Sequence, residues 1–164
     1  MTDEIEELLE QIARRTDCSI VPPSQPPVLR SGDTLPADVA RFYQVCGGAS
    51  LFEGSAYPAR IVSPHELVRA NPEIVGSDHP DDITDSWYII ARGGSEEAIS
   101  IDCATPRLGR CYDSFWDRHG VRGDCPIVAR SFTELLARLV DNRGEHWYWL
   151  RGAGTGYGDA YDGT

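Results

Sequence analysis

The sequence predicts an α+β fold in one domain, with a central, mostly antiparallel sheet flanked by about four helices. Two segments near the ends of the chain have the apolar spacing of amphipathic helices. Between them, apolar runs at Trp87–Ala91 and Ala98–Asp102 flank Gly93-Gly94, a pattern typical of an antiparallel hairpin. The 164 residues are enough to bury a hydrophobic core.

The first helix is predicted over about residues 3–15. Acidic residues at its start and arginines at its end suit the helix dipole. Its apolar residues recur at the spacing of one helical face: Ile5, Leu8, Leu9 and Ile12. Residues 21–33 follow as a proline-rich connector that cannot be helical, so we expect an extended surface segment. Its prolines are Pro22, Pro23, Pro26 and Pro27.

The second helix is predicted to begin at Leu35-Pro36 and to end at Gly47-Gly48, since glycine tolerates the left-handed cap conformation. Short strand signals follow at about residues 50–52 and 60–62. Ser63 and Glu66 have capping-box spacing, which predicts a short third helix to about residue 70. The polar stretch 72–86 is predicted to be a loop.

After the hairpin, residues 109–115 and 126–129 are predicted to add short apolar strands. Ser131 and Glu134 have the spacing of a second capping box, which predicts the start of the last helix. This helix is predicted to end near Asn142. The aromatic stretch 146–150 is read as a final strand, and the glycine-rich end as a frayed tail. We therefore divide the chain into a domain over 1–150 and a C-terminal tail over 151–164.

The charge of the chain narrows the choice of partners. The formal net charge is −11, and all 15 basic residues are arginine. A field of this sign repels phosphate backbones and anionic membranes and favours a basic protein. No apolar run approaches the ~20 residues of a membrane helix, and the acidic start lacks the features of a signal peptide. We expect a cytoplasmic protein that binds neither nucleic acid nor membranes.

No catalytic motif is recognisable. Without lysine there is neither a P-loop lysine nor a Schiff base. Asp102, Asp113 and Asp117 could form an acid/base set, but chance proximity in a chain with many acidic residues explains them better. Three cysteines and one histidine could be imagined as ligands of a zinc ion, but their spacing along the chain matches no common zinc-binding pattern. These residues are Cys103, Cys111, His119 and Cys125. We predict no catalysis, no metal and no cofactor, and we expect reduced, mostly buried thiols.

A set of ordered segments carries a resemblance to a known family. They are Leu35-Pro36-x-Asp38-x-x-x-Phe42-Tyr43-x-x-x-Gly47-Gly48, Ile61–Leu67, Trp87-x-Ile89-Ile90-Ala91-x-Gly93-Gly94, Ile99-x-Ile101-Asp102, Tyr112 and Ser131-Phe132-x-Glu134-Leu135-Leu136-x-x-Leu139. From about Thr2 to Asn142 the chain resembles the SUKH superfamily, the domain of fungal cell-wall-synthesis regulators and their bacterial relatives. The resemblance implies a single SUKH-like domain that binds a protein and has no common catalytic residue or cofactor.

Three functions remain open at this point. Many bacterial members resemble immunity proteins of polymorphic toxin systems, so the leading hypothesis is an antitoxin that neutralises a toxin by occluding its active surface. The acidic chain suits a basic partner, for example a nuclease toxin. A regulatory or scaffold protein with an endogenous partner is the alternative, and a small-molecule binder is the third hypothesis. The third would use Trp147, Tyr148 and Trp149.

The candidate partner-binding residues fall mainly in two acidic patches, one in the loop before Trp87 and one in the turn after Ala91. Because the loop before Trp87 and the turn after Ala91 lie at opposite ends of one strand spanning ~17 Å, one partner can touch both. Two further acids, beside the next strand, complete the set, and the oligomeric state stays open. The candidates are Asp78, Asp81, Asp82, Asp85, Glu96, Glu97, Asp113 and Asp117.

Overall fold

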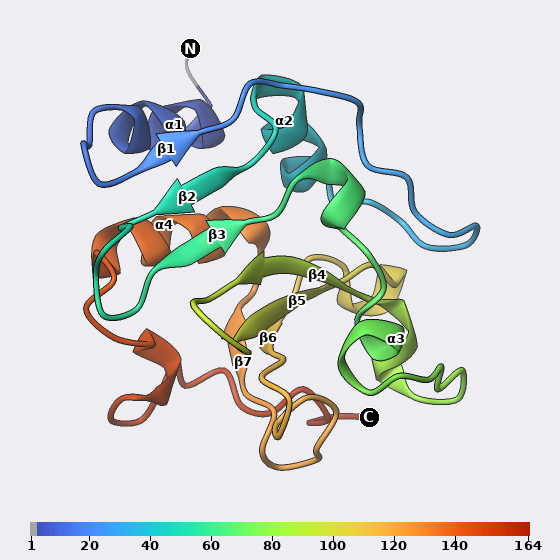
Figure 1. Ribbon diagram of the computed structural model, residues 1–164. Helices are drawn as coiled ribbons and strands as arrows, with labels where there is room; N and C mark the ends of the chain where they lie inside the picture. The colour runs from blue at the N-terminus through green and yellow to red at the C-terminus, as the bar shows by residue number, and fades with distance from the viewer. Residues whose placement is uncertain (1–2) are drawn as a thin grey trace.

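The computed structural model in Figure 1 describes residues 3–164, which form an antiparallel sheet at the centre of the molecule. Among these residues the sheet has seven strands in the order β1-β2-β3-β4-β5-β6-β7, so each strand pairs with the next along the chain. The predicted hairpin and the mostly antiparallel sheet are confirmed. The strands are β1 (Ser19–Ile20), β2 (Ala49–Leu51), β3 (Ala59–Ile61), β4 (Trp87–Arg92), β5 (Ala98–Asp102), β6 (Cys111–Asp113) and β7 (Ile127–Ala129).

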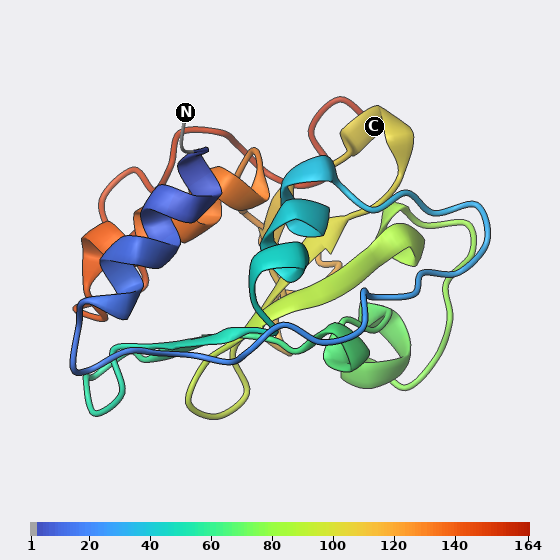
Figure 2. The same ribbon diagram turned by 90° about the horizontal axis from the view of Figure 1, so that it is seen from above.

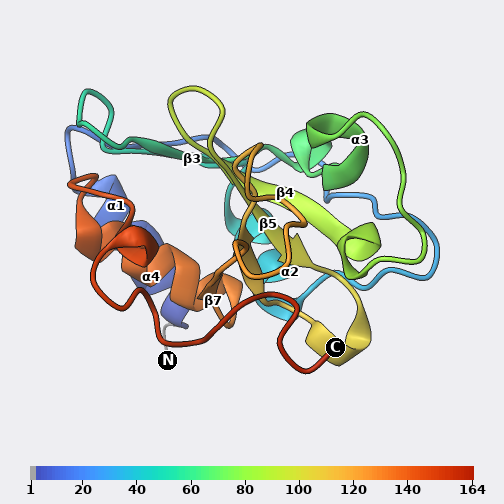
Figure 3. The ribbon, with the colours of Figure 1, turned by 90° about the horizontal axis from the view of Figure 1, so that it is seen from below.

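Three helices cover one face of the sheet, and a short fourth lies on the other side (Figures 2 and 3). The first three are α1 (Glu4–Ala13), α2 (Ala37–Val45) and α4 (Phe132–Asn142), and the fourth is α3 (Ala70–Ile74). The predicted α+β domain with about four helices is confirmed. No helix within residues 3–164 is long and apolar enough to cross a membrane.

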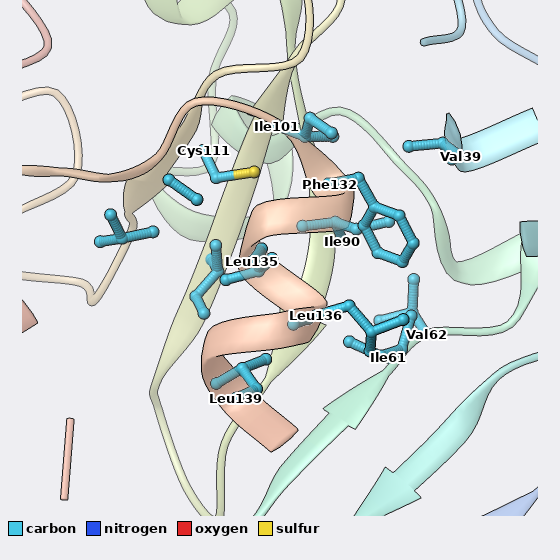
Figure 4. Close-up of a cluster of buried hydrophobic side chains, with 14 of the residues drawn as sticks. Val39, Ile61, Val62, Ile90, Ile101, Cys111, Phe132, Leu135, Leu136 and Leu139 are labelled. Atoms are coloured by element: carbon cyan, nitrogen blue, oxygen red, sulfur yellow. The ribbon is translucent and has the colours of Figure 1, made fainter. Parts of the chain in front are cut away.

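The apolar core lies between these helices and the sheet. Figure 4 shows Leu135 and Leu136 of α4 in the same cluster of buried side chains as Ile90 and Ile101 of the central strands. Leu135 is completely buried, and the buried residues of α1, α4 and the β4–β5 hairpin belong to one cluster. The capping box predicted for α4 is present in part, because the Ser131 hydroxyl accepts the Glu134 N–H at 3.1 Å. The periodicity of the sequence therefore identified the helix and its buried face.

The opposite face of the central strands carries a buried polar network. Asp102 is 0 % exposed and accepts the Trp87 indole N–H at 3.1 Å, the Tyr112 hydroxyl at 3.0 Å and the Arg107 Nε–H at 3.0 Å. The Trp87 and Tyr112 rings stack with centroids 4.0 Å apart. A buried carboxylate is tolerated only when it is paired and hydrogen-bonded, so this cluster is part of the fold.

Short elements differ from the prediction. The predicted third helix is instead a 3-10 helix at Pro64–Glu66, with its capping box in place. The helix α3 then forms at Ala70–Ile74, most of which was expected to be a loop. A second 3-10 helix at Ile83–Ser86 ends the same polar stretch. The predicted final strand over 146–150 is wrong, because a 3-10 helix at Tyr148–Leu150 buries Trp149 there.

The glycine-rich end is packed rather than frayed. Ala160 is 0 % exposed, and its N–H donates to the Cys125 carbonyl at 2.8 Å. The Tyr161 hydroxyl bonds to the Asp82 carboxylate at 2.8 Å and to the Gly120 carbonyl at 3.1 Å. At Gly154 the backbone has a φ of +66°, and a Cβ would lie 2.9 Å from the Trp149 carbonyl. Glycine here shapes a tight turn, while the division of the chain at residue 150 stays a prediction.

Candidate protein-interaction surface

Three surface segments carry the predicted acidic residues other than Asp113, which is the last residue of β6. They are the loop between α3 and β4 (residues 75–86, the acidic loop), the β4–β5 turn (residues 93–97) and the loop between β6 and β7 (residues 114–126, the long loop). Because β4 starts at Trp87 and ends at Arg92, the acidic loop and the β4–β5 turn lie at its opposite ends, as the sequence predicted.

Basic residues of the protein itself already neutralise half of the acidic loop. Asp78 is ion-paired with Arg69, and Asp85 lies 3.0 Å from Arg30 and 3.8 Å from Arg69. Asp78 keeps 58 % of its side chain exposed, while Asp85 keeps 22 %. These two carboxylates therefore offer a partner less uncompensated charge than the sequence suggested.

The other two aspartates of the acidic loop have different roles. Asp82 caps the 3-10 helix by accepting the Thr84 N–H at 2.9 Å and also accepts the Tyr161 hydroxyl. Although burial alone would raise the pKa of Asp82, these hydrogen bonds lower it, so the carboxylate stays ionised. Asp81 is exposed and makes no side-chain hydrogen bond or ion pair within residues 3–164. Asp81 is therefore the most available charge of this loop.

The β4–β5 turn presents one free carboxylate. Glu96 is exposed, whereas Glu97 is half-buried and accepts the Ser95 N–H at 2.9 Å. Glu97 also lines a small cavity of about 10 Å³ together with Arg118 and Trp149. Glu97 thus shapes the turn, and Glu96 is the residue that faces solvent.

The prediction that Asp113 contacts a partner is wrong, because the side chain is buried. Asp113 is 1 % exposed, and its Oδ2 accepts the Arg118 Nε–H at 2.7 Å and the Trp149 indole N–H at 2.8 Å. Its Oδ1 accepts the Phe115 N–H at 3.0 Å. At the end of β6, these three hydrogen bonds hold the carboxylate inward and anchor the start of the long loop.

The long loop exposes an aromatic side chain that the sequence reasoning overlooked. Trp116 is 60 % exposed. Its neighbour Asp117 keeps 48 % of its side chain exposed and lies 3.7 Å from the Arg118 guanidinium. Val121, in the same loop, is 41 % exposed. Tryptophan is enriched among the residues that dominate binding energy at interfaces. The available signal was the pair Phe115-Trp116 beside an acidic residue in a loop.

Buried hydrogen bonds tie the long loop to both acidic patches. Near the β4–β5 turn, the Ser114 N–H donates to the Ala98 carbonyl at 2.9 Å. Toward the acidic loop, the His119 Nε2 lies 2.7 Å from the Asn71 Oδ1, and Asn71 donates to the Thr84 hydroxyl at 2.9 Å. The long loop therefore spans the distance between the two patches, with Trp116 and Asp117 on its outer side.

The same polar chain is structural rather than catalytic. His119 Nδ1 lies 2.9 Å from the Ser114 hydroxyl, and His119 Nε2 lies 2.7 Å from Asn71 Oδ1. This order resembles the nucleophile, base and orienting residue of a catalytic triad. Ser114 is 0 % exposed and is closed to a substrate. Burial lowers the pKa of His119 to about 4, which keeps the imidazole neutral near pH 7. The relay holds the long loop on the sheet.

The cysteines considered as zinc ligands make other contacts. The Cys125 thiol donates to the Asp113 carbonyl at 3.3 Å, and burial raises its pKa to about 12. Burial likewise raises the pKa of Cys103 and Cys111. Within residues 3–164, no three His, Cys, Asp or Glu side chains form a group that would hold a metal ion. All five cysteines are free. Four of them are buried, which confirms the prediction of mostly buried thiols.

We expect chelation to leave the stability of the protein unchanged. A structural zinc contributes directly to the folding free energy, so its removal would lower the melting temperature or unfold the chain. The measurement is thermal melting, followed by circular dichroism, of protein purified without added metal, with and without EDTA. Stoichiometric zinc in that sample, together with loss of folding on its removal, would contradict the expectation and restore the cysteine site.

Comparison with known proteins defines the class of this protein. The chain belongs to the SMI1 / KNR4 family (SUKH-1), whose family model matches residues 30–138. It is also 46 % identical over 159 residues to the "Immunity protein YokJ" of Bacillus subtilis (strain 168). That alignment covers 97 % of this chain and 96 % of the relative. No solved structure is significantly similar to the chain.

Proposed function

We propose that this chain is an immunity protein that binds a toxin and neutralises it by covering its active surface. The observation that carries the proposal is the 46 % identity to an immunity protein along nearly the whole of both chains. Ser114, the hydroxyl of the buried polar chain, is 0 % exposed and closed to a substrate, which supports action by binding rather than by catalysis at that chain.

We further propose a basic partner, such as a nuclease toxin with a positively charged substrate groove. The net charge of −11 steers a basic domain toward the protein. Asp81, Glu96 and Asp117 would supply long-range attraction, since each is exposed. Trp116 would supply the apolar contact between them. The free state of all five cysteines suits action in the reducing cytoplasm.

The direct test is neutralisation of a candidate toxin domain, sought first among the genes beside this one. We expect a stable complex in size-exclusion chromatography and loss of toxin activity at equimolar immunity protein. A toxin that stays fully active in a several-fold excess of this chain would refute the proposal and favour the regulatory alternative. If neutralisation occurs but the blocked activity is not cleavage of nucleic acid, only the nuclease assignment fails.

Removing the exposed acidic charges of the candidate surface should slow association with the toxin. We expect Asp81→Asn, Glu96→Gln and Asp117→Asn together to lower the association rate about tenfold at low salt and to flatten its salt dependence. The melting temperature should hardly change, because exposed charges contribute little to stability. The measurement is stopped-flow association at two salt concentrations.

A matched control separates a local effect from one of net charge. Glu7→Gln, Glu10→Gln and Asp141→Asn remove the same charge from exposed positions on α1 and α4, which cover the other face of the sheet. This control should retain most of the association rate. Equal slowing by both triple variants would mean that total charge, rather than the candidate surface, steers the partner.

A further inference from the structure

An arginine-lined groove contains none of the acidic residues proposed to bind the toxin. Its volume is about 520 Å³, and its walls come from the 3-10 turn after β5, the flanks of β6 and β7, and the C-terminal segment. Three guanidinium-bearing residues line it: Arg107, Arg110 and Arg130. Such a concentration of positive charge is unexpected in a protein of net charge −11.

The arginines of this groove hold unused hydrogen-bond donors. All arginines and carboxylate side chains fall within residues 3–164, and ten of the 15 arginines lie within 4.0 Å of a carboxylate. Arg110 and Arg130 are among the five arginines without a carboxylate at that distance. Within residues 3–164, their side chains also make no hydrogen bond. Arg107 uses only its Nε–H, for Asp102, which leaves both terminal amino groups free.

Two of the arginines are held in place by the fold. The Nε of Arg107 lies 3.0 Å from Asp102, a carboxylate that is itself 0 % exposed and fixed by Trp87 and Tyr112. The Arg130 guanidinium lies 4.0 Å from the centre of the Tyr157 ring. Side chains that are already ordered lose less conformational entropy when they bind a ligand.

The Tyr157 ring beneath Arg130 is anchored in turn. Its hydroxyl donates to the Glu134 Oε2 at 2.7 Å. Tyr157 belongs to the glycine-rich end of the chain, and its neighbour Gly158 accepts the Ile127 N–H at 2.9 Å through its carbonyl. The packed C-terminal segment therefore completes the groove, which gives this segment a role beyond capping the sheet.

We propose that this groove binds the phosphate group of a small phosphorylated molecule. The guanidinium fork matches phosphate oxygens geometrically, and three such groups suit a dianion better than a single carboxylate. The one carboxylate in the lining is Asp162, whose Oδ2 is engaged by the Asp159 N–H at 2.8 Å. A nucleic-acid backbone is disfavoured, because its many phosphates would meet the negative field of the whole protein.

The test is titration with inorganic phosphate and with adenosine 5′-monophosphate at constant ionic strength. The readout is the NMR signal of the arginine Nε–H groups. We expect saturable shifts at Arg107, Arg110 and Arg130 with a dissociation constant in the millimolar range or tighter. Tighter binding of the nucleotide would mean that the groove also contacts the rest of the ligand, and equal binding would mean that phosphate alone is recognised. Both results support the proposal.

Variants of the lining give the expected sizes of effect. Arg110→Gln and Arg130→Gln should each weaken phosphate binding about tenfold, which corresponds to about 1.4 kcal/mol. Asp162→Asn should tighten binding a few-fold, because it removes the opposing charge. Arg151→Gln removes an exposed, unpaired arginine from outside the groove and should change nothing. Arg107 is left intact because its replacement would unpair the buried Asp102.

The outcomes separate this proposal from the proposed function. Absence of saturable shifts at about 50 mM phosphate would overturn it, and so would equal weakening by Arg151→Gln, which would indicate non-specific attraction. Loss of toxin binding in Arg130→Gln without any phosphate binding would also overturn it and assign the groove to the partner interface. Toxin neutralisation is measured separately, so failure of the phosphate site leaves the immunity assignment intact.

Discussion

Replacing Leu135 with aspartate is expected to abolish folding of the domain. Leu135 is 0 % exposed at the centre of the apolar face of α4 and lies against the central strands (Figure 4). Within the described core no basic side chain is positioned to pair with a carboxylate there. An unpaired buried charge costs more than about 4 kcal/mol, which approaches the total stability of ~5–15 kcal/mol of an ordinary domain.

The measurement for Leu135→Asp is a thermal melt followed by circular dichroism, with the dispersion of amide NMR signals as a second readout. Leu135→Ala should remain folded but lose about 2–5 kcal/mol of unfolding free energy, because it leaves a cavity without burying a charge. Gln11→Asp, at an exposed position of α1, controls for introducing aspartate into a helix. A cooperative melt of Leu135→Asp within a degree or two of wild type would contradict the assigned core.

Replacing Trp116 with alanine is expected to cause the largest loss of toxin affinity among exposed positions. A tryptophan anchor at an interface contributes about 2 kcal/mol or more, which corresponds to at least ~30-fold in the dissociation constant. The effect should lie mainly in the dissociation rate, whereas loss of acidic residues affects the association rate. Since 60 % of Trp116 is exposed, the melting temperature should change by only a few degrees.

The affinity is measured by surface plasmon resonance against the purified toxin domain. Trp116→Phe should retain part of the affinity, because it keeps an aromatic ring at the site. Val28→Ala, at an 87 % exposed position in the proline-rich connector, is the control and should bind as wild type. Unchanged toxin binding by Trp116→Ala would exclude the outer side of the long loop as the centre of the interface.

The long and strongly patterned elements could be predicted from the sequence. The apolar periodicity of α1 and α4, the prolines of the connector and the Gly93-Gly94 turn each express a local preference that the final fold keeps. The ordered set of motifs also sufficed for the family, which the match over residues 30–138 confirms. For these features the short-range pattern and the global packing favour the same structure.

The short elements could not be predicted, because their structure depends on distant contacts. β1 has two residues and α3 has five, too few to show a period. The aromatic sequence around Trp149 suggested a strand, but the position of Trp149 depends on the hydrogen bond from its indole N–H to Asp113, 36 residues away. The glycine-rich end has no pattern of its own and is ordered by hydrogen bonds to residues such as Cys125 and Asp82.

The same division applies to the candidate surface. The sequence by itself determined the acidic charge, the absence of lysine and the placing of two acidic patches at the ends of β4. Only the tertiary structure decided which carboxylates are free, since Arg69 and Arg30 reach Asp85 from 16 and 55 residues away and Asp113 is drawn inward by Arg118 and Trp149. A charge counts at an interface only if nothing in its own protein neutralises or buries it, and partners so distant in sequence are set by the packing of the whole chain.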